Sequence, residues 1–232
     1  MTSAILQFFE CHRDEGDGES ERDKRRFQRR LDAMGIRYKS LYVGIDGMFC
    51  LNLSGTMIAD LSPLTELPLT HLCLQGCYEI TDFSPLKDMS LTWLNLCGTR
   101  ITDLSPLARL SLSHLDLHRT RTADLSPLKG LPLRSLDIRF TKVTDLSPLG
   151  RMPLEKLSFY PSRISCGLDD LRGIESLATI NRRAAETFWT RYGRSLGHQT
   201  AASDQAIPCQ PRGSGCAPVL NRGALSSAAD AP

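Results

Sequence analysis

Apolar residues follow two rhythms in the middle of the chain. In residues 91–111, Leu94 and Leu96 are two positions apart, which is typical of the inward face of a short strand. The next apolar positions, Ile101, Leu104 and Leu107, are three apart, which indicates one turn of 3₁₀ or α helix. The pattern therefore predicts a short strand followed by a short helical turn.

This unit recurs along the chain at a nearly constant interval. Ser-Pro pairs begin at positions 62, 84, 105, 126 and 147, which gives steps of 22, 21, 21 and 21 residues. Six copies begin at Met48, Leu69, Leu91, Leu112, Leu133 and Leu154, and the last copy is divergent. One such unit cannot fold alone, so we expect the copies to stack and share a continuous core.

Polar positions within the unit are expected to support this stacking. Thr99 and its counterparts are suited to satisfy backbone groups where each coil turns. Those counterparts are Thr56, Cys77, Thr120, Thr141 and Ser162. Ser105 is expected to cap the helical turn, with Pro106 at its first position. Because every copy needs the same turn, we interpret the Ser-Pro pairs as structural rather than as phosphorylation sites.

The composition supports a repeat architecture. Of the 36 leucines, 30 fall within residues 48–180, and the chain has only three valines. That balance argues against an ordinary parallel or sandwich sheet, whose strands favour β-branched residues. The formal net charge of +2 argues against nucleic acid or a membrane surface as a partner. An N-terminus without the features of an export signal, and cysteines without obvious partners, favour a cytoplasmic location.

The segments around the repeats are predicted to cap them. Residues 19–34 have Phe27, Leu31 and Met34 at helical spacing, with Gly35 as a stop. The alternative is a basic nucleic-acid patch, but acidic residues dilute it and no aromatic residues are interleaved. Its members would be Arg22, Lys24, Arg25, Arg26, Arg29 and Arg30.

At the other end, Asn181 is expected to cap a helix that continues through Tyr192 and ends at Gly193. Ala184, Phe188 and Trp189 would cover the last coil. The expected organisation is a flexible N-terminus (1–18), an N-terminal helix and capping segment (19–47), six repeats (48–176), a C-terminal cap (177–194) and a disordered tail (195–232).

Leu91, Leu94, Leu96, Thr99 and Ile101 resemble the core pattern of the leucine-rich repeat family. The TDLSPLxxL half is similar to the short internalin-type repeat. The DLSPLKGLPL phrasing and the segment from Leu157 to Gly193 resemble leucine-rich regions of planctomycete and verrucomicrobial proteins that follow a serine/threonine kinase domain. The resemblance implies an α/β solenoid, a right-handed superhelix with a parallel concave sheet, a 3₁₀ or short helical convex side and helical caps. Kinase activity is not implied, because the kinase motifs are missing.

Function is expected to depend on the outward strand residues, which form three columns across the concave sheet. The columns are Cys50, His71, Trp93, His114, Ser135 and Lys156; Asn52, Cys73, Asn95, Asp116, Asp137 and Ser158; and Ser54, Gln75, Cys97, His118, Arg139 and Tyr160. Mixed aromatic and charged residues are typical of protein interfaces.

We therefore predict a non-enzymatic module that binds a partner protein and is itself a monomer. The candidate contact residues are Trp93, His71, His114, Asp116, His118, Asp137, Arg139, Lys156 and Tyr160. Two alternatives stay open: a regulatory or sensory fragment of a bacterial serine/threonine kinase system, and ordinary solvated residues on a neutral array. A secreted internalin-like adhesin would need an export signal.

Two chemical hypotheses are weaker. Cys97, His118 and Asp116 could form a nucleophile, a base and an orienting group, but a broad sheet offers no oxyanion hole and does not exclude water. His71, Cys73, Cys97, His114 and His118 are spread over too many coils to close on one zinc ion. No cofactor and no metal site are therefore expected.

Overall fold

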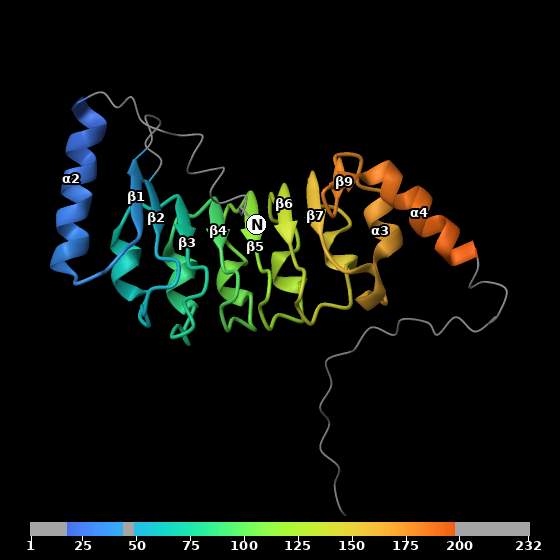
Figure 1. The fold of residues 1–232 in the computed structure, drawn as a ribbon, viewed down its shortest axis with the longest axis horizontal. Coiled ribbons are helices and arrows are strands. Elements are labelled where there is room, and N and C mark those ends of the chain that lie inside the picture. Colours follow the sequence, from blue (N-terminus) through green and yellow to red (C-terminus); the bar gives the residue numbers. More distant parts are fainter. Residues whose placement is uncertain (1–17, 44–48, 198–232) are drawn as a thin grey trace, which may run out of the picture.

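Residues 18–43 and 49–197 are described by a computed structural model, in which stacked coils form one elongated solenoid (Figure 1). The predictions of a flexible segment before residue 18 and of a disordered tail beyond residue 197 fall outside these ranges. No helix within them is long and apolar enough to cross a bilayer.

One sheet of nine strands runs the length of the solenoid, with its strands in chain order. The strands are β1 (Ser40–Val43), β2 (Phe49–Asn52), β3 (His71–Cys73), β4 (Trp93–Asn95), β5 (His114–Asp116), β6 (Ser135–Asp137), β7 (Lys156–Ser158), β8 (Thr179–Ile180) and β9 (Arg183–Ala184). Strands β2 to β8 pair in parallel, as predicted. The antiparallel end strands, β1 on β2 and β9 on β8, were not predicted.

The two apolar rhythms meet in one core. Leu94 of β4, Leu96 just beyond it, and Ile101, Leu104 and Leu107, which lead into the following turn, are all at most 1% exposed. Most equivalent residues of the other coils belong to the same buried cluster, although Ile58 and Ile164 are only partly buried and Thr122 replaces the isoleucine in one coil. In line across the sheet, Leu72, Leu94, Leu115 and Leu136 pair with one another. The predicted leucine-rich solenoid is confirmed, while the right-handed sense of its superhelix stays a prediction.

Four of the six coils turn their corner on a threonine hydroxyl, as predicted, whereas Ser162 of the last coil is exposed and makes no such contact among the described residues. The Thr99 hydroxyl donates a hydrogen bond to the Leu96 carbonyl at 2.8 Å. Thr56, Thr120 and Thr141 repeat this contact at 2.7–2.8 Å with the carbonyl three residues earlier. Cys77 differs, because its thiol donates to Leu53 of the preceding coil at 3.0 Å. Side chains of this position therefore fix the path of the backbone.

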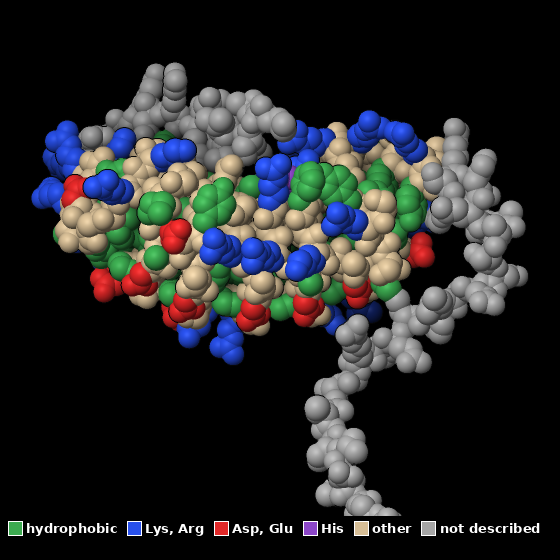
Figure 2. Space-filling view, turned by 60° about the horizontal axis from the view of Figure 1, so that its bottom comes forward, with side chains coloured by type: hydrophobic (Ala, Val, Ile, Leu, Met, Phe, Trp, Pro, Cys, Tyr) green, Lys and Arg blue, Asp and Glu red, His purple; other side chains and the backbone are tan. Residues whose placement is uncertain are grey.

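The convex side carries short 3₁₀ turns at Ser62–Glu66, Ser84–Asp88, Ser105–Leu107, Ser126–Leu128 and Ser147–Leu149. The predicted serine cap is wrong, because an aspartate two residues earlier performs that task. The Asp103 carboxylate accepts the Ser105 N–H at 2.8 Å, and the other four turns repeat this contact. Short polar side chains commonly bind the backbone two residues on. Acidic side chains form a row along one edge of the solenoid (Figure 2).

Helix α2 (Gly18–Ala33) covers the first coil (Figure 1). Phe27 and Leu31 are buried in the common core, and the Phe27 ring stacks on Phe49 with centroids 5.3 Å apart. Gly35 follows the helix with φ of +66°, a left-handed conformation that glycine adopts readily. One member of the alternative basic patch, Arg30, donates to the Glu66 carbonyl at 3.0 Å and so contacts the frame.

The C-terminal end departs from the prediction in its details. The last coil has a 3₁₀ turn at Pro161–Arg163 and a short helix, α3 (Leu168–Arg172), in place of the Ser-Pro turn. Helix α4 (Ala185–Gly197) continues past Gly193 and into the segment assigned to the tail. Phe188 and Trp189 pack against the core.

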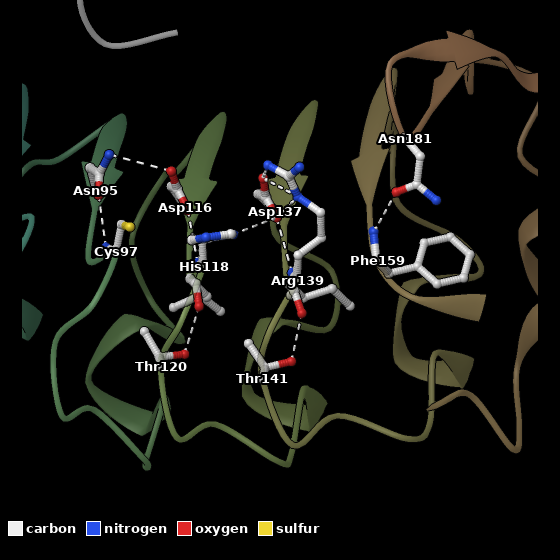
Figure 3. Close-up of polar contacts among 12 residues, drawn as sticks. Asn95, Cys97, Asp116, His118, Thr120, Asp137, Arg139, Thr141, Phe159 and Asn181 are labelled. Atoms are coloured by element: carbon white, nitrogen blue, oxygen red, sulfur yellow. Dashed lines mark hydrogen bonds and ion pairs between the residues drawn. The ribbon is translucent and has the colours of Figure 1, made fainter. Parts of the chain in front are cut away.

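Asn181 is not the N-cap of α4, so that prediction is wrong. It lies with Arg182 in the two-residue turn between β8 and β9, and both residues have positive φ, +52° and +65°. Two-residue hairpins of this kind need left-handed residues, and asparagine tolerates that conformation well. The Asn181 side chain instead accepts the Phe159 N–H at 2.9 Å (Figure 3).

Candidate functional site

The strand register places the outward residues in continuous columns. His71, Trp93, His114, Ser135 and Lys156 pair in succession, and so do Cys73, Asn95, Asp116, Asp137 and Ser158. The third column lies just beyond the strands. Backbone hydrogen bonds to the carbonyls of Gln75, Cys97, His118 and Arg139 extend the ladder there at 2.8–3.0 Å.

Several positions that were predicted to face solvent are buried. Cys50, Cys73 and Asn95 are fully buried, and His71 is only 7% exposed. The His71 ring stacks on Trp93 with centroids 6.1 Å apart, and its Nδ1 lies 3.0 Å from the Thr70 hydroxyl. His71 therefore supports Trp93 and offers little surface of its own.

The second column has a structural task that the sequence analysis missed. Side-chain oxygens of Asn52, Asn95, Asp116 and Asp137 each accept the backbone N–H two residues on, at 2.8–3.0 Å. Asn95 also donates to Asp116 at 3.4 Å (Figure 3). The recurrence of Asn and Asp in this column was the available signal. These residues shape the exit of each strand, and the oxygens that accept these backbone N–H groups are already occupied.

Five of the predicted contact residues line one shallow hollow of about 200 Å³ on the concave face: Trp93, His114, Asp116, Asp137 and Lys156. Arg182, from the turn after β8, joins them. The hollow has an aromatic wall at one end and basic residues at the other.

An ion pair lies beside this hollow. Arg139 donates to both carboxylate oxygens of Asp137, from Nε at 3.0 Å and from Nη2 at 2.5 Å (Figure 3). His118 Nδ1 lies 4.0 Å from the same carboxylate and has no hydrogen-bond partner among the described residues. The pair is rigid because two parallel hydrogen bonds fix the guanidinium.

Burial controls the protonation of the neighbouring groups. Burial, with a smaller contribution from Asp137, raises the pKa of Asp116 to about 6. Burial lowers the pKa of His118, although the Asp137 carboxylate opposes this shift. Near neutral pH the His118 ring is therefore neutral, and Asp116 is less easily ionised than an exposed aspartate.

A group of aromatic and cationic side chains lies at the rim of the concave face, and the sequence analysis predicted two of its four members, His118 and Tyr160. Phe140 is 48% exposed, and its ring makes edge contacts with His118 and Tyr160 at centroid distances of 5.1 and 4.9 Å. The Arg119 guanidinium lies 5.5 Å from the Phe140 centroid. Figure 2 shows basic side chains around hydrophobic ones near this end of the solenoid. We call these four residues the rim cluster.

Two members of the rim cluster have an unfavourable backbone conformation. Arg119 and Phe140 both have φ of +58°, at the position that Gly55, Gly76 and Gly98 occupy in the earlier coils. Left-handed conformations cost a non-glycine residue on the order of 1 kcal/mol, and such strain is concentrated at functional sites. The replacement of a repeated glycine by a large residue was the signal in the sequence.

The geometry disfavours the nucleophile hypothesis. Burial, together with the charge of Asp116, raises the pKa of the Cys97 thiol to about 12, so it stays protonated at neutral pH. Asp116 accepts the backbone N–H of His118, and Asp137 lies beside the His118 ring instead. The three groups therefore do not form a relay from thiol to base to orienting carboxylate.

The cysteines and potential metal ligands are not gathered in one place. Within the described ranges, no group of three or more His, Cys, Asp or Glu side chains could hold a metal ion. Cys73, Cys77 and Cys97 are free thiols, whereas Cys166 is disulfide-bonded. The cytoplasmic location stays a prediction.

Comparison with known proteins adds to this picture. No family model matches the chain, and no curated protein matches it. Among solved structures, the chain is similar to an internalin (InlF) of Listeria monocytogenes, with 28% identity and a TM-score of 0.51. The match covers 55% of this chain and 39% of that one.

A second internalin of the same organism, internalin C2, is 32% identical with a TM-score of 0.48. That match covers 55% of this chain and 58% of the other. The chain thus spans less than two thirds of either relative. Together with the 21-residue coils, the parallel sheet and the 3₁₀ turns, the likeness supports an internalin-type leucine-rich-repeat fold for this chain.

Proposed function

We propose that the chain binds a partner protein through the part of its concave face that runs from β4 to helix α4. One observation supports the proposal above all: the Asp137–Arg139 pair connects the hollow to the rim cluster. Asp137 lines the hollow, and its carboxylate also lies beside His118 of the rim cluster. Aromatic and arginine side chains contribute most of the binding energy in many interfaces. A non-enzymatic role is consistent with a Cys97 thiol that stays protonated.

The composition of this surface indicates a mixed, partly polar interface. Trp93 and Phe140 supply apolar area, while Lys156 and Arg182 supply positive charge at the C-terminal side. Such a surface favours a partner with an apolar centre and an acidic edge. The kinase-linked alternative stays a prediction, because no feature of the described residues favours it.

The test is a quantitative pull-down that compares wild type with a Trp93→Ala plus Lys156→Ala variant. Both residues line the hollow, and neither has a core position. The matched control is Met57→Ala plus Arg100→Ala, which removes two exposed side chains away from the hollow. We expect the first variant to lose at least one partner that wild type and the control retain. Equal recovery of every partner by all three proteins would contradict the proposal.

A further inference from the structure

A cleft of about 470 Å³ lies at the C-terminal end of the concave face, between the last coil and helix α4. Tyr160 and Phe159 form the side of the coil, and Phe188, Arg191 and Tyr192 form the side of the helix. Its volume is in the range of small-ligand and peptide-binding pockets. None of these residues lines the hollow described above. The cleft and the hollow are neighbours, because Arg139 of the cleft pairs with Asp137 of the hollow.

The charged groups of the cleft are all cationic. Arg139, Arg183 and Arg191 line it, and none of its ten lining residues is acidic. Arg139 is already paired with Asp137. Among the described residues, the guanidinium groups of Arg183 and Arg191 have no ion-pair or hydrogen-bond partner. Two positive charges therefore lie at the cleft without compensation.

The neutral polar groups also favour an acceptor as ligand. The Asn181 carbonyl oxygen is occupied by the Phe159 N–H, which leaves the amide NH₂ as the group able to serve a ligand. Guanidinium groups donate and never accept, and their paired N–H groups match a carboxylate or a phosphate. The charged groups of the cleft and the Asn181 amide are thus all donors, and its other polar side chains are the hydroxyls of Tyr160, Thr187 and Tyr192, which can donate as well as accept.

Aromatic rings form the apolar part of the cleft. Phe188 packs on buried Phe159 with centroids 5.8 Å apart, and Tyr192 stacks on Phe188 at 5.8 Å with an interplanar angle of 7°. Tyr160 lies opposite and is held against Phe140 of the rim cluster. Rings fixed in this way offer flat surfaces on which a planar side chain can stack.

We propose that this cleft binds an acidic peptide segment in which carboxylates alternate with aromatic side chains. Carboxylates would pair with Arg183 and Arg191, and a ring would stack between Tyr160 and the pair formed by Phe188 and Tyr192. A peptide fits better than a nucleotide, because phosphate sites typically use cradles of backbone N–H groups, and side chains supply the donors here. The inference rests on the proposed function, since the segment would belong to the partner protein.

The test measures binding of a fluorescein-labelled synthetic peptide of alternating Glu and Tyr to the full chain by fluorescence anisotropy. We expect saturable binding that weakens as salt is added. Arg183→Ala plus Arg191→Ala should raise Kd about tenfold or more, as expected for the loss of charge-assisted hydrogen bonds. The matched control, Arg100→Ala plus Arg121→Ala, removes two exposed arginines outside the cleft and should leave Kd unchanged.

Two further peptides separate charge from stacking. Replacing Glu by Gln should abolish the salt dependence and most of the binding, and replacing Tyr by Ser should weaken binding while the salt dependence remains. Absence of binding to wild type, equal Kd for the two arginine double variants, or tight binding of the Gln peptide would each overturn the inference. Because Trp93 and Lys156 are outside the cleft, their double variant should bind the Glu-Tyr peptide like wild type, so the two proposals can fail independently.

Discussion

On strands β2 to β4, four of the six positions of the first two columns hold buried side chains, those of Cys50, His71, Cys73 and Asn95. On β5 to β7 none of the six is buried, and three carry charged side chains, those of Asp116, Asp137 and Lys156. The strand register does not change between the two halves. The two halves therefore have the same strand arrangement, and they differ in the side chains at outward positions, which the core does not constrain.

The same contrast exists in the backbone just beyond the strands. In the first three coils a glycine adopts the left-handed conformation, and in the next two Arg119 and Phe140 do so. The C-terminal half thus accepts conformational strain in order to present a cation and a ring. Strain that the frame does not require is consistent with the proposal that these positions contact a partner.

The largest effects should come from the frame and should be alike in both halves. Leu72→Ala in β3 and Leu136→Ala in β6 each remove a buried leucine at the same strand position. Each should lower the free energy of unfolding by about 2–5 kcal/mol. Urea denaturation followed by circular dichroism measures this. A large loss for one variant and almost none for the other would show that the halves do not share one frame.

The sequence could predict the frame because its residues are fixed by a repeated spacing. Leucines at intervals of two and three indicated the strand, the turn and the shared core, and Ser-Pro indicated the turn position. The antiparallel strands β1 and β9 were missed because each occurs once and has no repeat to reveal it. The capping role of Asp103 and its equivalents was missed because a serine at the turn suggested a cap by itself.

The candidate site was predictable only as a set of positions. The columns follow from the strand period, but burial of His71 and Asn95 depends on neighbours from adjacent coils. The cleft beside α4 requires knowing where the C-terminal helix packs, and the predicted Asn181 cap gave no information about that. Phe140 and Arg119 were overlooked because they lie one residue beyond the three columns.

A smaller effect should distinguish the halves by pH. The pKa of Asp116 in the folded chain, about 6, lies above its unfolded value, so protonation favours the folded state. The stability contributed by protonated Asp116 is fully present at pH values below the pKa that Asp116 has in the unfolded chain. It is lost as the pH rises through the pKa that Asp116 has in the folded chain. Asp116→Asn should therefore raise the free energy of unfolding at neutral pH by about 1–3 kcal/mol, with the gain vanishing near pH 4.

Urea midpoints of wild type and Asp116→Asn across this pH range measure the difference directly. Asparagine keeps an oxygen for the His118 N–H, so the strand exit is preserved. Asn52 makes the equivalent backbone contact in the N-terminal half, but its amide does not titrate. No corresponding pH-dependent gain in stability can therefore be obtained there. A gain from Asp116→Asn that does not change between about pH 4 and 7 would contradict the assigned protonation.

The smallest effect concerns the left-handed position. Arg119→Gly should stabilise the fold by about 1 kcal/mol because it removes strain, while it weakens partner binding through loss of the contact with Phe140. Gly98→Ala, the reciprocal change in the N-terminal half, should destabilise by about 1 kcal/mol. Thermal melts of both variants measure these shifts. Destabilisation by Arg119→Gly would show that the arginine serves the fold instead of a ligand.

Helices α2 and α4 lie at opposite ends of the stack (Figure 1), each beside an antiparallel strand that closes the parallel ladder. A parallel ladder has the same pattern of donors and acceptors at every step, so an uncovered last coil would be a template for the first coil of another molecule. End-to-end growth into a filament would require displacing one of these helices and the core residues that it buries. The caps therefore set the length of the concave face within the described residues.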